Sequence, residues 1–188
     1  MEDIAKDILI RASQGDMQAF EDVYKTSSSF VYNVALSVVN NKEDALEVSQ
    51  EVFMVLYYKL KSFRFESSFK TWVYRITANC SINFAKKSSR VKTVPYDDAI
   101  GEGSVLMDTK AEIEQEYNAK FVERLLSELN PDQRACVVLR DIQGLSYEQI
   151  AQALGININT VRSRLKRSRG KLMSLKSKFS YELKRGDL

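Results

Sequence analysis

The stretch LSYEQIAQALGININTVRSRLKRSRGKL, residues 145–172, decides the fold of the C-terminal part of the chain. Ser146 is expected to cap a short helix, with Glu148 in the first turn, where the helix dipole favours an acidic side chain. Gly155 makes a turn, and Asn159 is expected to cap a second, longer helix. A helix, a glycine-containing turn and a second helix form the helix-turn-helix pattern, whose second helix enters the major groove of DNA.

The second of these helices carries three sets of side chains when its residues are placed on a helical wheel. The stripe that should face the protein comprises Val161, Leu165, Ser168, Leu172 and Leu175. The side chains in reach of base edges are Thr160, Ser163, Lys166 and Arg167. The side chains on the flanks, where phosphates would run, are Arg162, Arg164, Arg169 and Lys171. No acidic residue interrupts this basic run, so a merely solvated helix would repel itself, and we expect it to bind DNA.

Charge is distributed unevenly along the 188 residues and divides the chain into three parts. Residues 1–88 carry 11 basic and 11 acidic side chains, residues 89–116 carry 3 and 7, and residues 117–188 carry 14 and 7. The middle part also lacks sustained periodicity and contains Pro95 and two glycines. We therefore expect two small helical domains, 1–88 and 117–188, joined by a flexible acidic linker at 89–116.

The fold class follows from the scarcity of turn-forming residues. Seven glycines and two prolines are about 5% of the chain, against an average near 12%, so long helices are favoured over a β-rich fold. Caps at Asp16 and Asn41 and the apolar periodicity predict helices at about 2–14, 16–39, 42–61 and 68–87. Asn130 and Pro131 begin another helix, which ends at Gly144. The whole chain is predicted to be all-α.

The predicted helix at 42–61 has an unusual face opposite its core stripe. The stripe comprises Ala45, Val48, Val52, Val55, Leu56 and Leu60. The opposite face carries Glu47, Gln50, Met54 and Tyr58, with Glu51 and Tyr57 beside it. An exposed methionine and tyrosines ringed by carboxylates are typical of a protein-docking surface. Alternatively these residues pack under a neighbouring helix, and periodicity alone does not decide between the two.

The predicted helix at 68–87 and the loop before it combine polar and aromatic side chains. The core stripe comprises Phe69, Val73, Ile76, Cys80 and Phe84. Another side carries Thr71, Arg75, Asn79 and Lys86, with Trp72 and Ile82 near its edge. In the loop, Phe63 and Phe65 flank Arg64. Such a surface suits single-stranded nucleic acid, because cations follow the backbone and rings stack on bases. Periodicity alone favours the plainer alternative, in which the rings belong to the core and Arg75 is merely solvated.

Composition excludes several classes of function. The chain has no histidine, so a His-dependent triad or a His-ligated metal is impossible, and two cysteines, Cys80 and Cys136, are too few for a metal site. We expect no enzymatic activity, no cofactor and no metal. No run approaches 18 apolar residues and the N-terminus lacks a signal-peptide stretch, so we expect no membrane insertion and a cytoplasmic protein.

Three segments in this order resemble the bacterial sigma factors of the extracytoplasmic-function (ECF) group, the members of the sigma-70 family with two main domains. DALEVSQEVFMVLYYKLKSF, residues 44–63, resembles the helix that docks on the polymerase clamp. FESSFKTWVYRITANCSINFAKK, residues 65–87, resembles the segment that melts the promoter and reads the minus-10 element. The stretch at 145–172 resembles the segment that reads the minus-35 element.

The resemblance implies a role for each set of residues. It implies contacts with core RNA polymerase from Glu47, Gln50, Glu51, Met54 and Tyr58. It implies contacts with the non-template strand at minus-10 from Phe63, Arg64, Ser67, Ser68, Thr71, Trp72, Arg75, Asn79 and Lys86. Among these, Phe63, Asn79 and the loop at 64–68 would form a pocket for a flipped base. It implies contacts with the minus-35 duplex from Asn159, Thr160, Arg162, Ser163, Arg164, Lys166, Arg167 and Arg169. The acidic linker would thread through polymerase toward the RNA exit channel.

The chain departs from the family pattern at a few positions. The family usually has a proline and a glycine in the turn before the recognition helix, where this chain has Asn157 and Asn159, so the base preference is expected to differ. Asn83 stands where the family often has an aspartate, and Glu47-Val48 where it often has Asp-Leu. The resemblance also implies a membrane-anchored anti-sigma factor that covers the docking and DNA faces.

Two other functions remain open on the sequence. A stand-alone helix-turn-helix regulator explains residues 117–188 equally well, and it predicts a homodimer that binds duplex DNA without polymerase. An RNA-binding adaptor that uses the aromatic loop would bind RNA as well as DNA and would direct no initiation.

Overall fold

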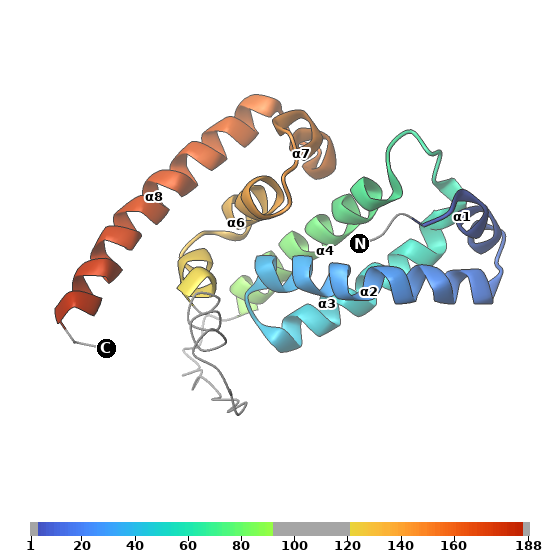
Figure 1. Cartoon of the computed structure of the whole chain (residues 1–188), viewed down its shortest axis with the longest axis horizontal. Coiled ribbons are helices and arrows are strands. Elements are labelled where there is room, and N and C mark those ends of the chain that lie inside the picture. Colours follow the sequence, from blue (N-terminus) through green and yellow to red (C-terminus); the bar gives the residue numbers. More distant parts are fainter. Residues whose placement is uncertain (1–3, 92–120, 186–188) are drawn as a thin grey trace.

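The computed structural model describes residues 4–91 and 121–185, and every regular element among them is a helix (Figure 1). This confirms the all-α prediction. The expected linker at 89–116 falls outside the described residues, apart from residues 89–91, which continue a helix. None of the helices in the described ranges is long and apolar enough to cross a membrane.

The N-terminal part consists of α1 (Lys6–Ser13), α2 (Met17–Val39), α3 (Lys42–Lys59), a short 3-10 turn η1 (Leu60–Ser62) and α4 (Phe69–Val91). The expected caps are present: the Asp16 carboxylate accepts a hydrogen bond from the Ala19 amide at 3.1 Å, and Asn41 accepts one from Asp44 at 2.9 Å. The Ser68 hydroxyl accepts from the Thr71 amide at 3.1 Å at the start of α4. These side chains satisfy amides that a helix leaves unpaired in its first turn, which fixes where each helix begins.

The C-terminal part consists of helical residues 121–127, α6 (Pro131–Val137), a π-helical turn η2 (Val138–Ile142), α7 (Tyr147–Leu154) and α8 (Ile158–Arg185). Asn130 caps α6 by accepting from the Gln133 amide at 2.9 Å, as expected from the Asn-Pro pair. The Ser146 hydroxyl caps α7 by accepting from the Gln149 amide, and the Gln149 side-chain oxygen accepts from the Ser146 amide; this reciprocal arrangement was not predicted from the sequence. Gly155 has a φ of 63° and ends α7, as predicted.

The prediction that Asn159 caps the recognition helix is wrong. A cap at Asn159 would make Thr160 the first helical residue. Helix α8 instead begins two residues earlier, at Ile158. The Asn157 side chain accepts a hydrogen bond from the Asn159 amide at 2.8 Å, and the Asn157 carbonyl accepts one from the Thr160 amide at 2.9 Å. Either asparagine of the turn could cap the helix, and Asn157, the first of them, accepts the hydrogen bonds of the unpaired amides.

The two parts pack against each other. Helices α6 and α7 lie against α4, and α6 also contacts α2, whereas α8 runs along the outside of α6 and α7 (Figure 1). A stripe on α4, formed by Tyr74, Ala78 and Ile82, joins the apolar cluster that also holds Leu139 and Ile150 of the C-terminal part. A separate cluster fills the interior of the N-terminal part between α1, α2, α3 and α4. Helix α4 thus packs into both clusters.

Candidate functional site

The outer face of α3 is open and hollow. Met54 is 61% exposed and Tyr58 is 67% exposed, so these two residues do not pack under a neighbouring helix. They line a groove of about 700 Å³ together with Gln50. Glu47 and Glu51 are exposed on the same helix. The five residues expected to dock on a partner therefore share one accessible face.

The other wall of this groove comes from α2, and the sequence analysis missed it. It includes Phe20, Tyr24 and Tyr32, and Tyr24 is 49% exposed with its ring centroid 4.6 Å from that of Phe53. Tyr57 contacts Phe20 edge to face at 5.1 Å. A wheel drawn for one helix cannot show which residues of another helix flank it. The exposed aromatic residues of α2 were the available signal.

The loop before α4 carries an aromatic cluster centred on Phe63. Its ring centroid lies 4.9 Å from that of Trp72 and 4.7 Å from that of Phe65. Phe65 has a φ of 57°, a region that phenylalanine rarely adopts, and its ring remains 40% exposed beneath the Lys6 ammonium. Phe63 and Trp72 are half-buried, so they are neither fully core nor fully free. Arg64 is exposed and Ser67 half-buried in the same loop.

A smaller hollow lies between α3 and α4. It has a volume of about 340 Å³, and its polar lining includes Lys59, Arg75 and Asn79, with Trp72 at its edge. Trp72 therefore links the aromatic cluster of the loop to the polar residues of α4. The Ser68 and Thr71 hydroxyls are bonded to each other at 2.8 Å at the start of the helix. Burial raises the pKa of the Cys80 thiol, which also lines the hollow, to about 11, so it stays protonated and unreactive at neutral pH.

Side chains of the described residues form hydrogen bonds between the two parts of the molecule. The Asn79 amide donates to the Ala153 carbonyl of α7 at 3.1 Å. The Tyr74 hydroxyl donates to the Gln143 side chain, and burial raises the pKa of this tyrosine to about 12, which keeps the proton in place. The Arg134 guanidinium donates to the Val38 carbonyl at 2.8 Å. Asn79, which the sequence analysis places on a nucleic-acid face, is therefore half-buried and already bonded.

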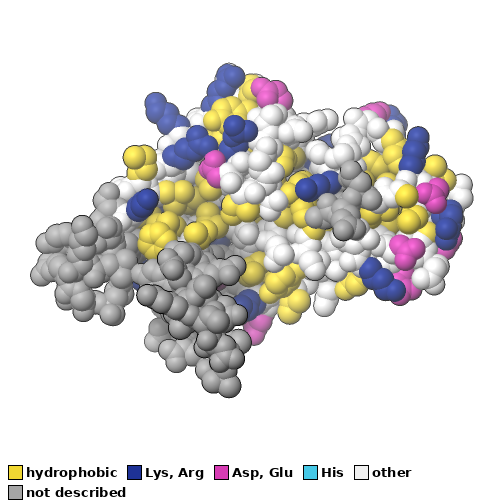
Figure 2. Space-filling model, in the orientation of Figure 1, with side chains coloured by type: hydrophobic (Ala, Val, Ile, Leu, Met, Phe, Trp, Pro, Cys, Tyr) yellow, Lys and Arg dark blue, Asp and Glu magenta, His cyan; other side chains and the backbone are white. Residues whose placement is uncertain are grey.

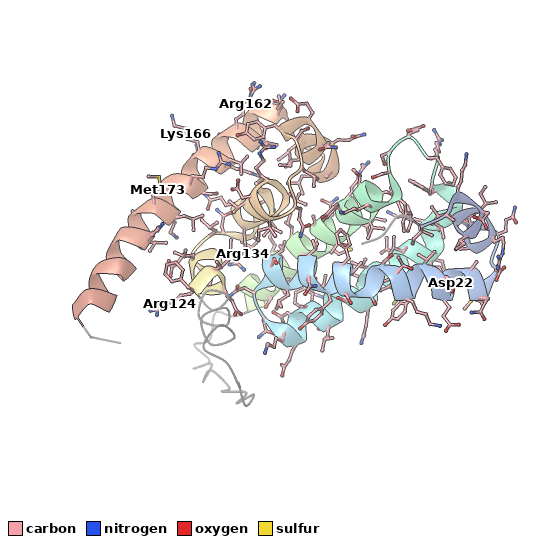
Figure 3. The ribbon with its side chains drawn as sticks, viewed as in Figure 1. Asp22, Arg124, Arg134, Arg162, Lys166 and Met173 are labelled. Carbon is pink, nitrogen blue, oxygen red and sulfur yellow. The ribbon has the colours of Figure 1, made fainter. Side chains whose placement is uncertain are left out.

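Arg134 is a buried cation held by carbonyl groups. It is 8% exposed, and besides Val38 it donates to the carbonyls of Leu126, Ser127 and Leu129 at 2.8 to 3.0 Å. These carbonyls lie at the C-terminal ends of α2 and of the helix at 121–127, where the helix dipoles favour positive charge. Burial lowers the pKa of Arg134, although an arginine stays charged in proteins. Figure 3 shows this residue between α6 and α2.

The outer face of α8 carries exposed basic side chains. Arg162 and Lys166 point away from the rest of the molecule (Figure 3), and Arg167 is exposed as well. Figure 2 shows Lys and Arg side chains gathered over the α7 and α8 end. Thr160 and Ser163 are half-buried, and the Ser163 hydroxyl donates to the Thr160 carbonyl at 3.0 Å. The buried side of the helix contains Val161, Leu165 and Ser168, as the wheel predicts.

Three of the four flanking cations of α8 are paired with carboxylates. Arg164 is 3.2 Å from Asp132, and the same carboxylate is 2.8 Å from Lys86 of α4. Arg169 is 2.7 Å from Asp141, which raises the pKa of that arginine. Lys171 pairs with Glu128, and the Arg162 guanidinium donates to Asn159 at 3.0 Å. No cluster of potential metal ligands is present among the described residues.

Two family models match the chain over these surfaces. Residues 23–91 match sigma-70 region 2, and residues 122–172 match sigma-70 region 4. The ECF RNA polymerase sigma-E factor of Haemophilus influenzae is 32% identical over 169 residues, which are 85% of this chain and 88% of that protein. The chain belongs to the ECF RNA polymerase sigma factors.

Other comparisons agree with this family. The ECF sigma factor SigE of Mycolicibacterium smegmatis is 29% identical to this sigma factor over 178 residues, which cover 90% of this chain and 66% of the relative. The sigma factor RpoE of Bartonella quintana, solved in complex with the anti-sigma factor NepR, is 23% identical and has a TM-score of 0.64. The match covers 84% of this chain and 96% of that one, which shows that the two chains share a fold.

The expected residues of this sigma factor fall into three groups in space. The docking residues share the open face of α3, while the minus-10 residues lie along the loop and α4. The minus-35 residues follow α8 from Asn159 to Arg169. Lys86 of the second group and Arg164 of the third both pair with the Asp132 carboxylate, a contact that was not predicted from the sequence. The i, i+4, i+8 spacing of Tyr74, Ala78 and Ile82 was a signal only that further helices pack on this side of α4.

Proposed function

We propose that this sigma factor docks on core RNA polymerase through the groove between α2 and α3. The supporting observation is that Met54 and Tyr58 remain more than half exposed beside an open apolar groove. Aromatic side chains and methionine are enriched in protein interfaces, and a few central anchors such as tyrosine carry most of the binding free energy. Glu47 and Glu51 at the rim provide charge that steers a basic partner surface.

The loop at 63–68 and the outer face of α4 are proposed to hold the melted non-template strand at minus-10. The half-buried rings of Phe63 and Trp72 offer stacking surfaces, and Arg75 and Asn79 line the adjacent hollow. Stacking contributes about 1–3 kcal/mol per base, which offsets the cost of unstacking the duplex. The protein would catalyse no bond change itself, and it would stabilise the open state of the promoter.

Helix α8 is proposed to read the minus-35 duplex in the major groove. Lys166 and Arg167 would contact base edges, because they lie exposed opposite the buried stripe of Val161 and Leu165. The flanking arginines 162, 164 and 169 would contact phosphates. The domains at 1–88 and 117–188 would then occupy two promoter elements, which requires the segment between them to span the distance.

An anti-sigma factor is a further proposed partner. The supporting observation is the shared fold with the Bartonella quintana protein, which was solved in complex with the anti-sigma factor NepR. We propose that such a factor, anchored in the membrane, would hold this protein away from polymerase. The sigma factor itself would act in the cytoplasm, where polymerase and promoter meet.

Run-off transcription with purified core polymerase and genomic DNA fragments tests the proposed function. Discrete transcripts that start only when this protein is added are expected. The Met54→Ala, Tyr58→Ala double variant should lose them, whereas Ile10→Ala, which removes an exposed apolar side chain outside the groove, should keep them. Duplex binding without any polymerase-dependent start would favour the stand-alone helix-turn-helix regulator instead.

A further inference from the structure

A lysine of the first helix lies over an aromatic ring of the loop at 63–68. The Lys6 ammonium is 5.0 Å from the centre of the Phe65 ring, and both side chains are exposed. Lys6 is the first residue of α1, whose buried Leu9 and Ala12 fix the helix in the N-terminal core. Helix α1 also packs against η1, which leads into the loop (Figure 1). The ammonium is therefore held beside the loop by a folded element.

The two cations of α1 differ in their partners. Arg11 lies 2.8 Å from the Asp16 carboxylate. Within the residues that the structure describes, the Lys6 side chain forms neither an ion pair nor a hydrogen bond, and its ammonium faces the Phe65 ring instead. A lysine ammonium carries three donors and binds phosphate as a point charge. Lys6 therefore has the charge and the donors that a phosphate requires.

The Phe65 backbone holds the ring in this place at an energetic cost. Its φ of 57° lies in the left-handed region, which phenylalanine rarely adopts, and such conformations cluster at binding and catalytic sites. The ring packs on Phe63 with the centroids 4.7 Å apart, yet it stays 40% exposed. A ring that served the core alone would be covered, so the open part of Phe65 is available for a ligand.

The aromatic rings form a continuous row between two cations. Phe65 contacts Phe63, and the Phe63 centroid lies 4.9 Å from that of Trp72. Trp72 lines the hollow that also contains Arg75. Lys6 thus lies at one end of the row and Arg75 at the other. A flipped nucleotide has a phosphate on each side of its base, and a cation at each end of the rings can hold both.

We propose that α1 belongs to the single-strand site, with Lys6 as a phosphate ligand and Phe65 as a stacking surface for the nucleotide next to the flipped base. Arg75 holds the backbone on one side of the flipped base, and Lys6 holds it on the other. This inference rests on the proposed assignment of the loop and α4 to the melted strand. It extends that site to a helix that has no role in the assignment.

The salt dependence of single-strand binding separates a phosphate contact from a structural one. A labelled random single strand of about 12 nucleotides is titrated with the free full-length protein at several salt concentrations, and fluorescence anisotropy reports binding. Lys6→Ala should weaken binding about threefold and lower the slope of log affinity against log salt by about 0.7, the value for one phosphate of a single strand. Lys6→Arg, which keeps the charge, should restore both.

A matched lysine provides the control for net charge. Lys42 is exposed and begins α3, whereas the loop follows the far end of that helix. Lys42→Ala should therefore bind the strand with the affinity and the salt slope of the wild type. A Lys6→Ala variant that loses affinity with an unchanged slope would mean that Lys6 only positions the loop, and this would overturn the proposal.

Two variants of Phe65 separate its ring from its strained backbone. Phe65→Gly and Phe65→Ala both remove the ring, but only glycine adopts the left-handed region without a steric cost. Both should lose about fivefold or more in single-strand affinity with an unchanged salt slope, because stacking is lost but no charge is. Phe65→Gly should be the more stable of the two in urea unfolding. A Phe65→Gly variant that binds as tightly as the wild type would contradict the stacking role.

Arg75→Ala keeps this inference apart from the proposed function. It removes a cation of the assigned minus-10 surface, so it should also lower the salt slope by about 0.7. If Arg75→Ala weakens binding while Lys6→Ala matches Lys42→Ala, the loop and α4 bind the strand without α1 and the inference is wrong. If neither Arg75→Ala nor Lys6→Ala changes binding, the assignment of this surface to a single strand fails, and the inference fails with it.

Discussion

Helices α3 and α4 are neighbours whose sides facing away from the N-terminal core differ in exposure. Each packs one stripe into the N-terminal core, but the other face of α3 is open, with Tyr58 67% exposed, while Tyr74 on α4 is only 2% exposed. The cover on α4 comes from α6 and α7, which begin at Pro131 and Tyr147, whereas α4 ends at Val91. The proposed polymerase surface on α3 is therefore accessible, whereas the C-terminal part covers one side of α4 and engages the Asn79 and Lys86 side chains of the proposed DNA surface.

The largest expected effect concerns Arg134, which holds the covered side together. Arg134→Ala should lower the free energy of unfolding by about 2–4 kcal/mol, because it removes a buried cation and leaves four carbonyls without their donor. Arg162→Ala removes an exposed arginine and should change stability by no more than about 0.5 kcal/mol. Urea unfolding followed by circular dichroism compares the two. Equal stabilities would mean that Arg134 does not hold the parts together.

The next effect tests the open side. Replacement of Met54 and Tyr58 by alanine should weaken binding to core polymerase by about 2 kcal/mol or more, because truncated central anchors cost that much. Helical circular dichroism should be unchanged, since both side chains are exposed. Titration of labelled protein with core polymerase measures the affinity. An unchanged dissociation constant would mean that core polymerase does not bind at this groove.

A smaller effect should separate the two kinds of arginine on α8. Arg167→Ala should cost about 1–3 kcal/mol on the preferred minus-35 duplex and narrow its advantage over scrambled duplexes. Arg164→Ala should weaken binding to all duplexes alike and reduce the salt slope by about one, because one proposed phosphate contact is lost. Titrations at several salt concentrations test both. If Arg164→Ala changed the sequence preference and Arg167→Ala did not, Arg164 would face the bases. The side of α8 assigned to the bases would then be wrong by about a third of a helical turn.

The smallest effect distinguishes the two asparagines before α8. Asn157→Ala should lower the free energy of unfolding by about 1 kcal/mol, because its side chain caps the helix. Asn159→Ala should cost less, since its side chain bonds only to the exposed Arg162. Thermal unfolding of both variants measures the difference. The reverse order would restore Asn159 as the cap.

The sequence alone was sufficient for what depends on local chemistry. Asp16, Asn41, Asn130 and Ser146 each cap the expected helix, because a cap acts within three residues of itself. The prediction of the buried stripe of α8 was correct because side chains within one helix repeat with a single known period.

Contacts between distant segments were not accessible in this way. The wall that α2 adds to the groove and the bridge from Asp132 to Lys86 depend on how helices pack. In the sequence, Asp132 is an ordinary acidic residue in a first helical turn, and only the fold places it between Lys86 and Arg164 of the two proposed DNA-binding surfaces. The cap of α8 was likewise assigned to the wrong one of two asparagines in the turn, since both have the same side-chain chemistry.

Oxidative footprinting of the full-length protein, free and bound to core polymerase on promoter DNA, tests the contrast between α3 and α4 most directly. In the free protein, Met54 and Tyr58 should be modified rapidly and Tyr74 should be protected. In the complex the pattern should reverse, because polymerase covers the groove and the parts separate. A reactive Tyr74 in the free protein, or Met54 and Tyr58 that stay reactive in the complex, would contradict this account.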